Sequence, residues 1–181
     1  MLFRSLYDLS AHDDRRFSPY CWRARFALAH KGLSYETEPV SFGEKSKIAF
    51  SNQPLVPVLV DDGHSVADSW KIACYLEDKY KDRPSLFGGA VGQAEAFFIN
   101  NWCDKIVQPS LVPGIIFSIF QKVRPSDQAY FRESREKRFG KTLEAMHAER
   151  ESHIANFRKA IEPVRGVLAA QPYLGGDSPR Y

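Results

Sequence analysis

The order of hydrophobic and polar positions near the start of the chain predicts a strand, a helix and a second strand. Residues 2–10 (LFRSLYDLS) are rich in strand-forming side chains and contain no glycine or proline. Apolar residues then recur at helical spacing between Ser18, a good N-cap followed by Pro19, and Gly32, a typical helix end. Residues 34–42 predict the second strand, and a helical crossover of this length predicts a parallel pair.

A hairpin and a second helix follow. Residues 58–60 are a short apolar run, the Asp-Gly pair at 62–63 is a tight-turn signal, and residues 64–66 predict the return strand. The Asp-Ser pair at 68–69 then opens a helix whose apolar side extends to Tyr80. The pattern predicts a small α/β unit with a mixed sheet.

The strand pattern stops after a linker-like stretch. Residues 91–123 are a long apolar helical stretch, in which we expect Pro109 and Pro113 to cause a kink or a break. The remainder is also helical in composition. We therefore expect an α/β domain over residues 1–81, a linker over 82–90 and an all-helical domain over 91–181.

Composition and charge exclude several classes of protein. The chain has 181 residues, of which 44% are hydrophobic and 26% charged, and its formal net charge is +3. These values are ordinary for a globular protein and predict no nucleic-acid partner. The longest apolar run, residues 114–120, is too short to span a bilayer, so we expect no membrane segment. The three cysteines are odd in number and lack metal-ligand spacing, which predicts no metal site and a reducing, cytoplasmic location.

Three segments carry a resemblance to a known family. SPYCWRARFALAHKG (18–32) and VPVLVDDGHSVADSWKIACYLEDKY (56–80) resemble the glutathione S-transferases, and with YLGGDSPRY (173–181) they look most like the lignin β-aryl-etherase branch and its ether-cleaving fungal relatives. The resemblance implies a thioredoxin-like N-terminal domain, an all-α C-terminal domain and a homodimer. YLGGDSPRY resembles the lead-in to a central buried helix, so we expect the natural chain to continue past Tyr181.

The start of the first helix resembles a Cys-Pro-Tyr-Cys redox site in which Ser18 replaces the first cysteine. A serine hydroxyl forms no disulfide, but it can donate a hydrogen bond to a thiolate. The attacking sulfur would then come from glutathione, the co-substrate that the resemblance implies. The alternative is that Ser18 only caps the helix. Two rivals for the activating role are Tyr7, at the end of the first strand, and Cys21, whose other interpretation is a small buried hydrophobe.

The resemblance also implies the residues that hold glutathione. Val56 would pair with its cysteinyl backbone ahead of a cis Pro57, and Asp68 and Ser69 would bind its γ-glutamyl group at a helix N-terminus. Asp68 and Ser69 can also cap the helix, since capping and ligand binding use different donors. For Pro57 the alternative is a proline that ends a loop, but the following hairpin and the Asp-Ser pair favour the binding role. The family often places Lys or Gln before Val-Pro, where this chain has Leu55, and Gln53 is the candidate substitute.

The second substrate should be apolar. Tyr20, Trp102, Ile106 and Phe117 are candidates to line its pocket, although for each one ordinary core packing is the alternative. Three functions follow: glutathione attack on an aromatic electrophile or β-aryl ether, storage of hydrophobic ligands with little turnover, and thiol oxidoreduction through Cys21.

Overall fold

The computed structural model describes residues 3–181, so Leu2 of the first predicted strand lies outside the described residues. The described residues divide into two compact units, one that ends at Phe87 and also includes Tyr181, and one of residues 88–180. Tyr181 belongs to the first unit because its ring packs against Trp70 and Phe87, at centroid distances of 5.4 and 5.8 Å.

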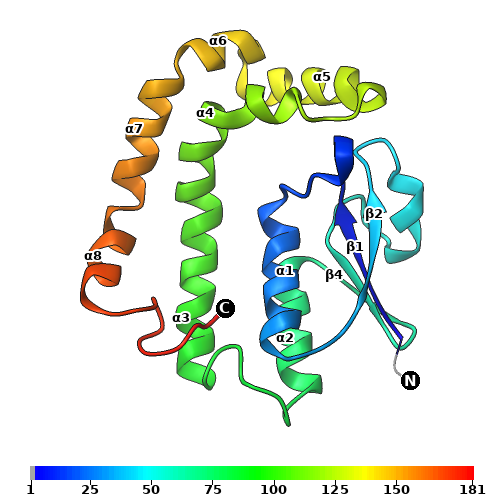
Figure 1. Ribbon diagram of the computed structural model, residues 1–181, viewed down its shortest axis with the longest axis vertical. Helices are drawn as coiled ribbons and strands as arrows, with labels where there is room; N and C mark the ends of the chain where they lie inside the picture. The colour runs from blue at the N-terminus through cyan, green and yellow to red at the C-terminus, as the bar shows by residue number, and fades with distance from the viewer. Residues whose placement is uncertain (1–2) are drawn as a thin grey trace. The chain divides into compact units, whose positions relative to one another are not determined.

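The N-terminal unit has a four-stranded mixed sheet, with helices drawn beside it in Figure 1. Its elements are β1 (Arg4–Leu9), α1 (Pro19–His30), β2 (Glu36–Val40), β3 (Val58–Asp61), β4 (His64–Ala67) and α2 (Ser69–Lys79), with a 3₁₀ segment (Lys45–Ser51) between β2 and β3. The strand order is β2-β1-β3-β4. β1 and β2 are parallel as predicted, and the other two pairs are antiparallel. The 3₁₀ segment was not predicted.

The strand register brings three chain segments to one end of the sheet. Tyr7 near the end of β1 is opposite Val58 at the start of β3, and Val58 is opposite Ala67 at the end of β4. The loop into α1, the chain leading to β3 and the start of α2 therefore all leave the sheet at this end. Since α1 and α2 both begin here and pack together, their N-termini face the same side of the unit (Figure 1).

Side chains alternate between the two faces of β1. Leu6 is fully buried, as are Leu28 of α1 and Ile72 of α2. The neighbouring Tyr7 packs instead against a buried cluster that includes Val58. This alternation is the period of two that a strand imposes, and it assigns Leu6 and the following Asp8 to one face and Tyr7 to the other.

The second unit is helical. Its elements are α3 (Ala90–Trp102), a π-helical segment (Cys103–Val107), α4 (Gln108–Phe120), α5 (Gln128–Phe139), α6 (Leu143–Ala148), α7 (Arg150–Ala160) and α8 (Glu162–Ala170). Of the kink or break expected at Pro109 and Pro113, the break does not occur, because the helical run continues through both residues. The π-helical segment precedes Pro109, which occupies the first turn of α4, and Pro113 lies within α4. The irregular turn thus accommodates the missing donor of Pro109 without ending the helical run.

Residues Ala90–Phe120 form one helical run of 31 residues, and 11% of its most apolar window is buried. By length and composition alone this run could cross a membrane, in contrast to the expectation from the shorter apolar run within it. Core helices of other proteins pass the same test. The absence of a membrane segment therefore stays a prediction.

Within the helical unit, Gly114 of α4 permits close packing against α7, because a Cβ at this position would lie 3.1 Å from the Cβ of His153.

A buried ion network ties β3 to β1 and α2. Asp61, which is fully buried, accepts hydrogen bonds from Arg4 Nε at 2.9 Å, Tyr80 at 2.6 Å and Tyr75 at 3.0 Å. Burial alone would raise the pKa of Asp61, but hydrogen bonds from Tyr80, Lys79 and Tyr75 and the charge of Arg4 hold it below its usual range. The folded state therefore gains stability from Asp61 above pH ~4, and loses it as the pH falls through the lowered pKa.

We predict that Asp61→Asn lowers the free energy of unfolding at pH 7 by about 3–5 kcal/mol, because it leaves the buried Arg4 guanidinium uncompensated. The variant should also lose less stability than the wild type between pH 5 and roughly 2. Urea unfolding at several pH values measures both effects. The matched control is Asp62→Asn in the exposed hairpin turn, which should stay within about 0.5 kcal/mol of the wild type. Equal effects from the two substitutions would contradict this account.

Candidate functional site

Ser18 is the N-cap of α1, as predicted, and lies at the end of the sheet described above. Its Oγ accepts a hydrogen bond from the backbone N–H of Cys21 at 3.3 Å, and the residue is 8% exposed. A hydroxyl that accepts in this way keeps its own proton for donation to another group. The helix N-terminus adds a partial positive charge. Ser18 therefore combines a hydroxyl donor with a site that favours an anion.

Val56 and Pro57 are joined by a cis peptide bond, as the resemblance implied. Val56 precedes the β3 ladder, and within residues 3–181 its backbone N–H and C=O take part in no hydrogen bond. The backbone N–H of Asp68 donates to Pro57 C=O at 3.3 Å, which connects this turn to the start of α2. An extended peptide could thus pair with Val56 as an additional strand.

Asp68 is the N-cap of α2 and has an unusual backbone conformation, with φ of 81°. Its Oδ1 accepts from the N–H groups of Trp70 at 3.0 Å and Lys71 at 3.1 Å. Within the described chain, its Oδ2 and the N–H of Ser69 have no partner. Asp68 is exposed while Ser69 is 3% exposed, so Asp68 offers the more accessible side chain. The start of α2 therefore presents one carboxylate oxygen and one backbone donor.

Gln53 is engaged within its own loop. Its Nε2 donates to the C=O of Leu55, and its Oε1 accepts from the N–H of Leu55 at 3.2 Å. The Leu55 side chain is 68% exposed. Gln53 would have to give up these contacts to reach a ligand, so the loop before Val56 offers no ready polar side chain at this place.

The structure separates Ser18 from its two rivals. Tyr7 contacts Phe50 edge-on at 5.1 Å and lies on the sheet face opposite α1. Cys21 is fully buried, and burial followed by the charge of Asp8 raises the pKa of its thiol to about 12. These observations support the interpretation of Cys21 as a small buried hydrophobe.

The predicted pocket residues belong to both units, with Tyr20 in the first and Trp102, Ile106 and Phe117 in the second. Tyr20 is 39% and Ile106 50% exposed, while Trp102 is half-buried at the end of α3. Phe117 packs against the ring of His147 at 4.9 Å, so its side chain contributes to packing within the helical unit. A shared pocket for these residues stays a prediction.

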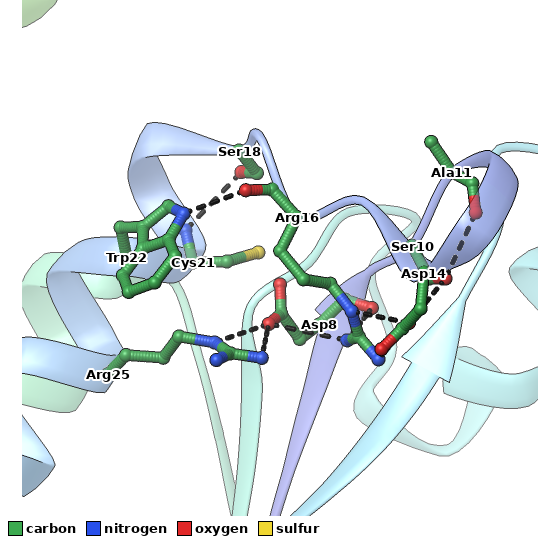
Figure 2. A network of polar contacts seen from close by, with 9 residues as sticks. All are labelled: Asp8, Ser10, Ala11, Asp14, Arg16, Ser18, Cys21, Trp22 and Arg25. Atoms are coloured by element: carbon green, nitrogen blue, oxygen red, sulfur yellow. Dashed lines mark hydrogen bonds and ion pairs between the residues drawn. The ribbon is translucent and has the colours of Figure 1, made fainter. Parts of the chain in front are cut away.

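A polar network next to Ser18 was not predicted (Figure 2). Asp8, which is 1% exposed, accepts from Arg25 Nε at 2.6 Å and forms an ion pair with Arg16. The signal that could have revealed it is the acidic residue at an inward position of β1, since a buried carboxylate requires a cationic partner. Two arginines, one before Ser18 in the sequence and one after it, thus contact the same carboxylate.

Comparison with known proteins identifies the family. A model of the N-terminal domain of glutathione S-transferases matches residues 14–84, and a model of their C-terminal domain matches residues 94–181. The chain belongs to the glutathione S-transferase family. The thioredoxin-like N-terminal unit and the helical C-terminal unit are thus confirmed as the fold of these transferases.

Relatives and solved structures agree with this membership. A zeta-class glutathione S-transferase of Euphorbia esula is 28% identical over 165 residues, which are 88% of this chain and 72% of the relative. A glutathione S-transferase of Arabidopsis thaliana is 24% identical, and the match covers 89% of this chain and 63% of the relative. The present chain thus spans about two thirds of the length of these relatives.

Fungal transferases are among the solved structures that this chain resembles. A glutathione transferase of Phanerochaete chrysosporium superposes with a TM-score of 0.87 at 26% identity, over 98% of this chain and 79% of the other. A glutathione S-transferase of Ceriporiopsis subvermispora, solved in complex with glutathione, has a TM-score of 0.83 at 25% identity, over 99% and 82%. No group of three or more potential metal-ligating side chains occurs among residues 3–181.

We predict that Cys21 of the native protein resists alkylation by iodoacetamide at pH 8. With a thiol pKa of about 12, its thiolate fraction is on the order of a thousandfold below that of an ordinary cysteine. Cys74 and Cys103 are partly exposed and should react first. Peptide mapping over time measures the three rates. Labelling of Cys21 as fast as the other two would revive the thiol-oxidoreductase hypothesis.

Proposed function

We propose that the protein is a serine-type glutathione transferase, in which Ser18 activates the sulfur of bound glutathione. The observation that supports this most is the position of Ser18 at the N-terminus of α1, at the sheet end where the cis Val56-Pro57 turn and the start of α2 also lie. The hydroxyl proton of Ser18, which also reaches the Cys21 sulfur, would turn to a glutathione thiolate placed there.

We assign the rest of the tripeptide to groups near Ser18 in the same unit. Val56 offers its free backbone N–H and C=O to the cysteinyl residue of glutathione. The Oδ2 of Asp68 is available to the γ-glutamyl ammonium, and the N–H of Ser69 at the start of α2 is available to the α-carboxylate. Gln53 has no role in this assignment because its amide is bound within its own loop.

The energetic demand on Ser18 and α1 is moderate. A free thiol has a pKa near ~8.5, and helix N-termini with nearby donors lower thiol pKa values to roughly 3.5–7.5. A decrease of about two units corresponds to about 2.7 kcal/mol and makes most of the bound thiol reactive at pH 7. One charge-assisted hydrogen bond and one helix terminus together can supply this amount.

The thiolate would attack a hydrophobic acceptor, for which we propose an aromatic electrophile or a β-aryl ether. The resemblance of residues 18–32 and 56–80 to the etherase branch supports this substrate class, as does the apolar character of Trp102, Ile106 and Phe117. A panel of aryl halides and β-aryl ethers, each assayed with glutathione, would separate simple conjugation from ether cleavage.

A binding protein with little turnover is the second candidate. It is favoured by the loop before Val56, where Leu55 is exposed and Gln53 is turned inward, because fewer polar contacts would then hold glutathione. Binding of an apolar dye without turnover of any acceptor in the panel would support this second function over the first.

We predict that Ser18→Ala raises the pKa of the bound glutathione thiol and slows transfer by about 10²–10³-fold, the usual effect of removing a donor to an anion. Glutathione affinity should change little, because the tripeptide is held by other groups. Tyr7→Phe is the matched hydroxyl deletion and should retain nearly the full rate. Ser18→Cys should gain disulfide exchange with glutathione and lose conjugation. A fully active Ser18→Ala with an inactive Tyr7→Phe would contradict the assignment.

We predict that Asp68→Asn weakens glutathione binding by roughly 1–3 kcal/mol, since it removes the charge opposite the ammonium group. The asparagine oxygen can still cap α2 through Trp70 and Lys71, so the melting temperature should hardly change. Asp68→Ala loses both functions and should also destabilise the fold by about 1 kcal/mol. Calorimetric titration and thermal unfolding separate the two effects. Unchanged affinity in the Asn variant would remove Asp68 from the site.

A further inference from the structure

The carboxylate of Asp8 is buried on the side of β1 that faces α1. Its Oδ2 is 2.6 Å from both Nε and the terminal NH2 nitrogen of Arg25, and 3.4 Å from a terminal nitrogen of Arg16. Asp8 itself is 1% exposed. Charge-assisted contacts of this length at a buried carboxylate are strong and directional, so they fix the position of both guanidinium groups against the strand.

The two arginines lie on opposite sides of Ser18 in the chain. Arg16 precedes the helix, and its carbonyl oxygen accepts from the indole Nε1 of Trp22 at 2.9 Å. Arg25 is in the second turn of α1. One carboxylate therefore connects β1 to the chain before Ser18 and to the helix after it. The position of the Ser18 hydroxyl relative to the sheet depends on this connection.

The second oxygen of Asp8 has no such contact. Oδ1 is buried and lacks a hydrogen-bonding partner within the described residues. Figure 2 shows the carboxylate directed toward the sulfur of Cys21, and the thiol of Cys21 interacts with Asp8. An unpaired buried carboxylate oxygen is costly, and a thiol S–H that donates toward it reduces that cost.

We propose that Asp8 is a positioning residue of the glutathione site, which holds Ser18 in place through its two arginines and keeps the Cys21 thiol protonated beneath it. This inference builds on the proposed function. A thiolate at Cys21 would stand against the Asp8 carboxylate, whose opposition exceeds the support from the Ser18 hydroxyl and the backbone of Leu9. The charged groups that contact Asp8 are Arg16 and Arg25, and Asp14 lies beyond Arg16. The N-terminus of α1 thus supports a single thiolate, that of glutathione.

The first test titrates Cys21 in the free protein, with Cys74 and Cys103 replaced by serine, through the ultraviolet absorbance of the thiolate. In Asp8→Asn, the amide oxygen can turn to the arginines and the NH2 group to the Cys21 sulfur. The group beside the sulfur then changes from a hydrogen-bond acceptor to a donor. We expect the midpoint for Cys21 to fall by one unit or more, about tenfold more thiolate at a given pH. Circular dichroism verifies that each variant stays folded over the titration.

Asp14→Asn is the matched control. Asp14 accepts from Arg16 Nε at 2.7 Å but is exposed, so its loss loosens the same loop without changing the charge beside Cys21. Its Cys21 midpoint should equal that of the wild type. An unchanged midpoint in Asp8→Asn, or an equal shift in both variants, would overturn the role of Asp8 toward Cys21. Because no glutathione is present, this result is independent of whether the protein is a transferase.

The second test measures glutathione turnover. Asp8→Asn should lower kcat by roughly tenfold or more with little change in KM for glutathione, since the tripeptide is held elsewhere, while Asp14→Asn should retain both. Full kcat in Asp8→Asn would overturn the positioning role. If Asp8→Asn does not fold, Arg25→Lys is the substitute, because it loses the two-atom contact with Asp8 but keeps the positive charge. Arg25→Lys should lower kcat and leave the titration midpoint of Cys21 unchanged. A full rate in this variant would refute the proposal. Absence of turnover in the wild type, with the Cys21 midpoint shifted in Asp8→Asn, would reject the transferase function and retain the interaction of Asp8 with Cys21.

Discussion

The pairing of Tyr7 with Val58, and of Val58 with Ala67, determines where every proposed glutathione contact lies. Since β3 begins and β4 ends in this row, and β1 ends two residues beyond it, the three connecting segments emerge at one end of the sheet. A shift of one residue in either pair would turn the side chains of the strand to the opposite face. The buried side chains on both faces of the sheet oppose such a shift, so the packing of the core and the placement of the site have the same origin.

At that end of the sheet, the helix N-termini define the chemistry. Ser18 and Asp68 cap their helices and yet keep one group each for a ligand, the hydroxyl proton in the first case and a carboxylate oxygen in the second. Capping and ligand binding are therefore compatible at both helix starts, because they use different groups. The exchange of cysteine for serine at position 18 preserves the anion-favouring helix terminus while moving the reactive sulfur to glutathione.

Local chemistry was sufficient to predict much of this unit. The Ser-Pro start of α1, the Asp-Gly turn and the Asp-Ser start of α2 each specify their own conformation through capping, a fixed φ angle or a left-handed residue. The contacts of Asp8 with Arg16 and Arg25 could not be predicted in this way, because they depend on how α1 lies against β1. The inward turn of Gln53 likewise results from a loop geometry that residue types alone do not define. In the second unit, a kink or a break was expected at the prolines, but the helical run continues through both, and the π-helical segment before Pro109 is an irregularity that residue types alone did not specify.

Backbone amide NMR of the uniformly labelled protein during a titration with glutathione tests the central claim most directly. The account predicts that the largest shifts occur at the start of α1 near Ser18, at Val56 and at the start of α2 near Ser69, with smaller changes along the remainder of the sheet. Saturable shifts confined to other parts of the chain, or none at millimolar glutathione, would contradict the claim that this end of the sheet is the glutathione site.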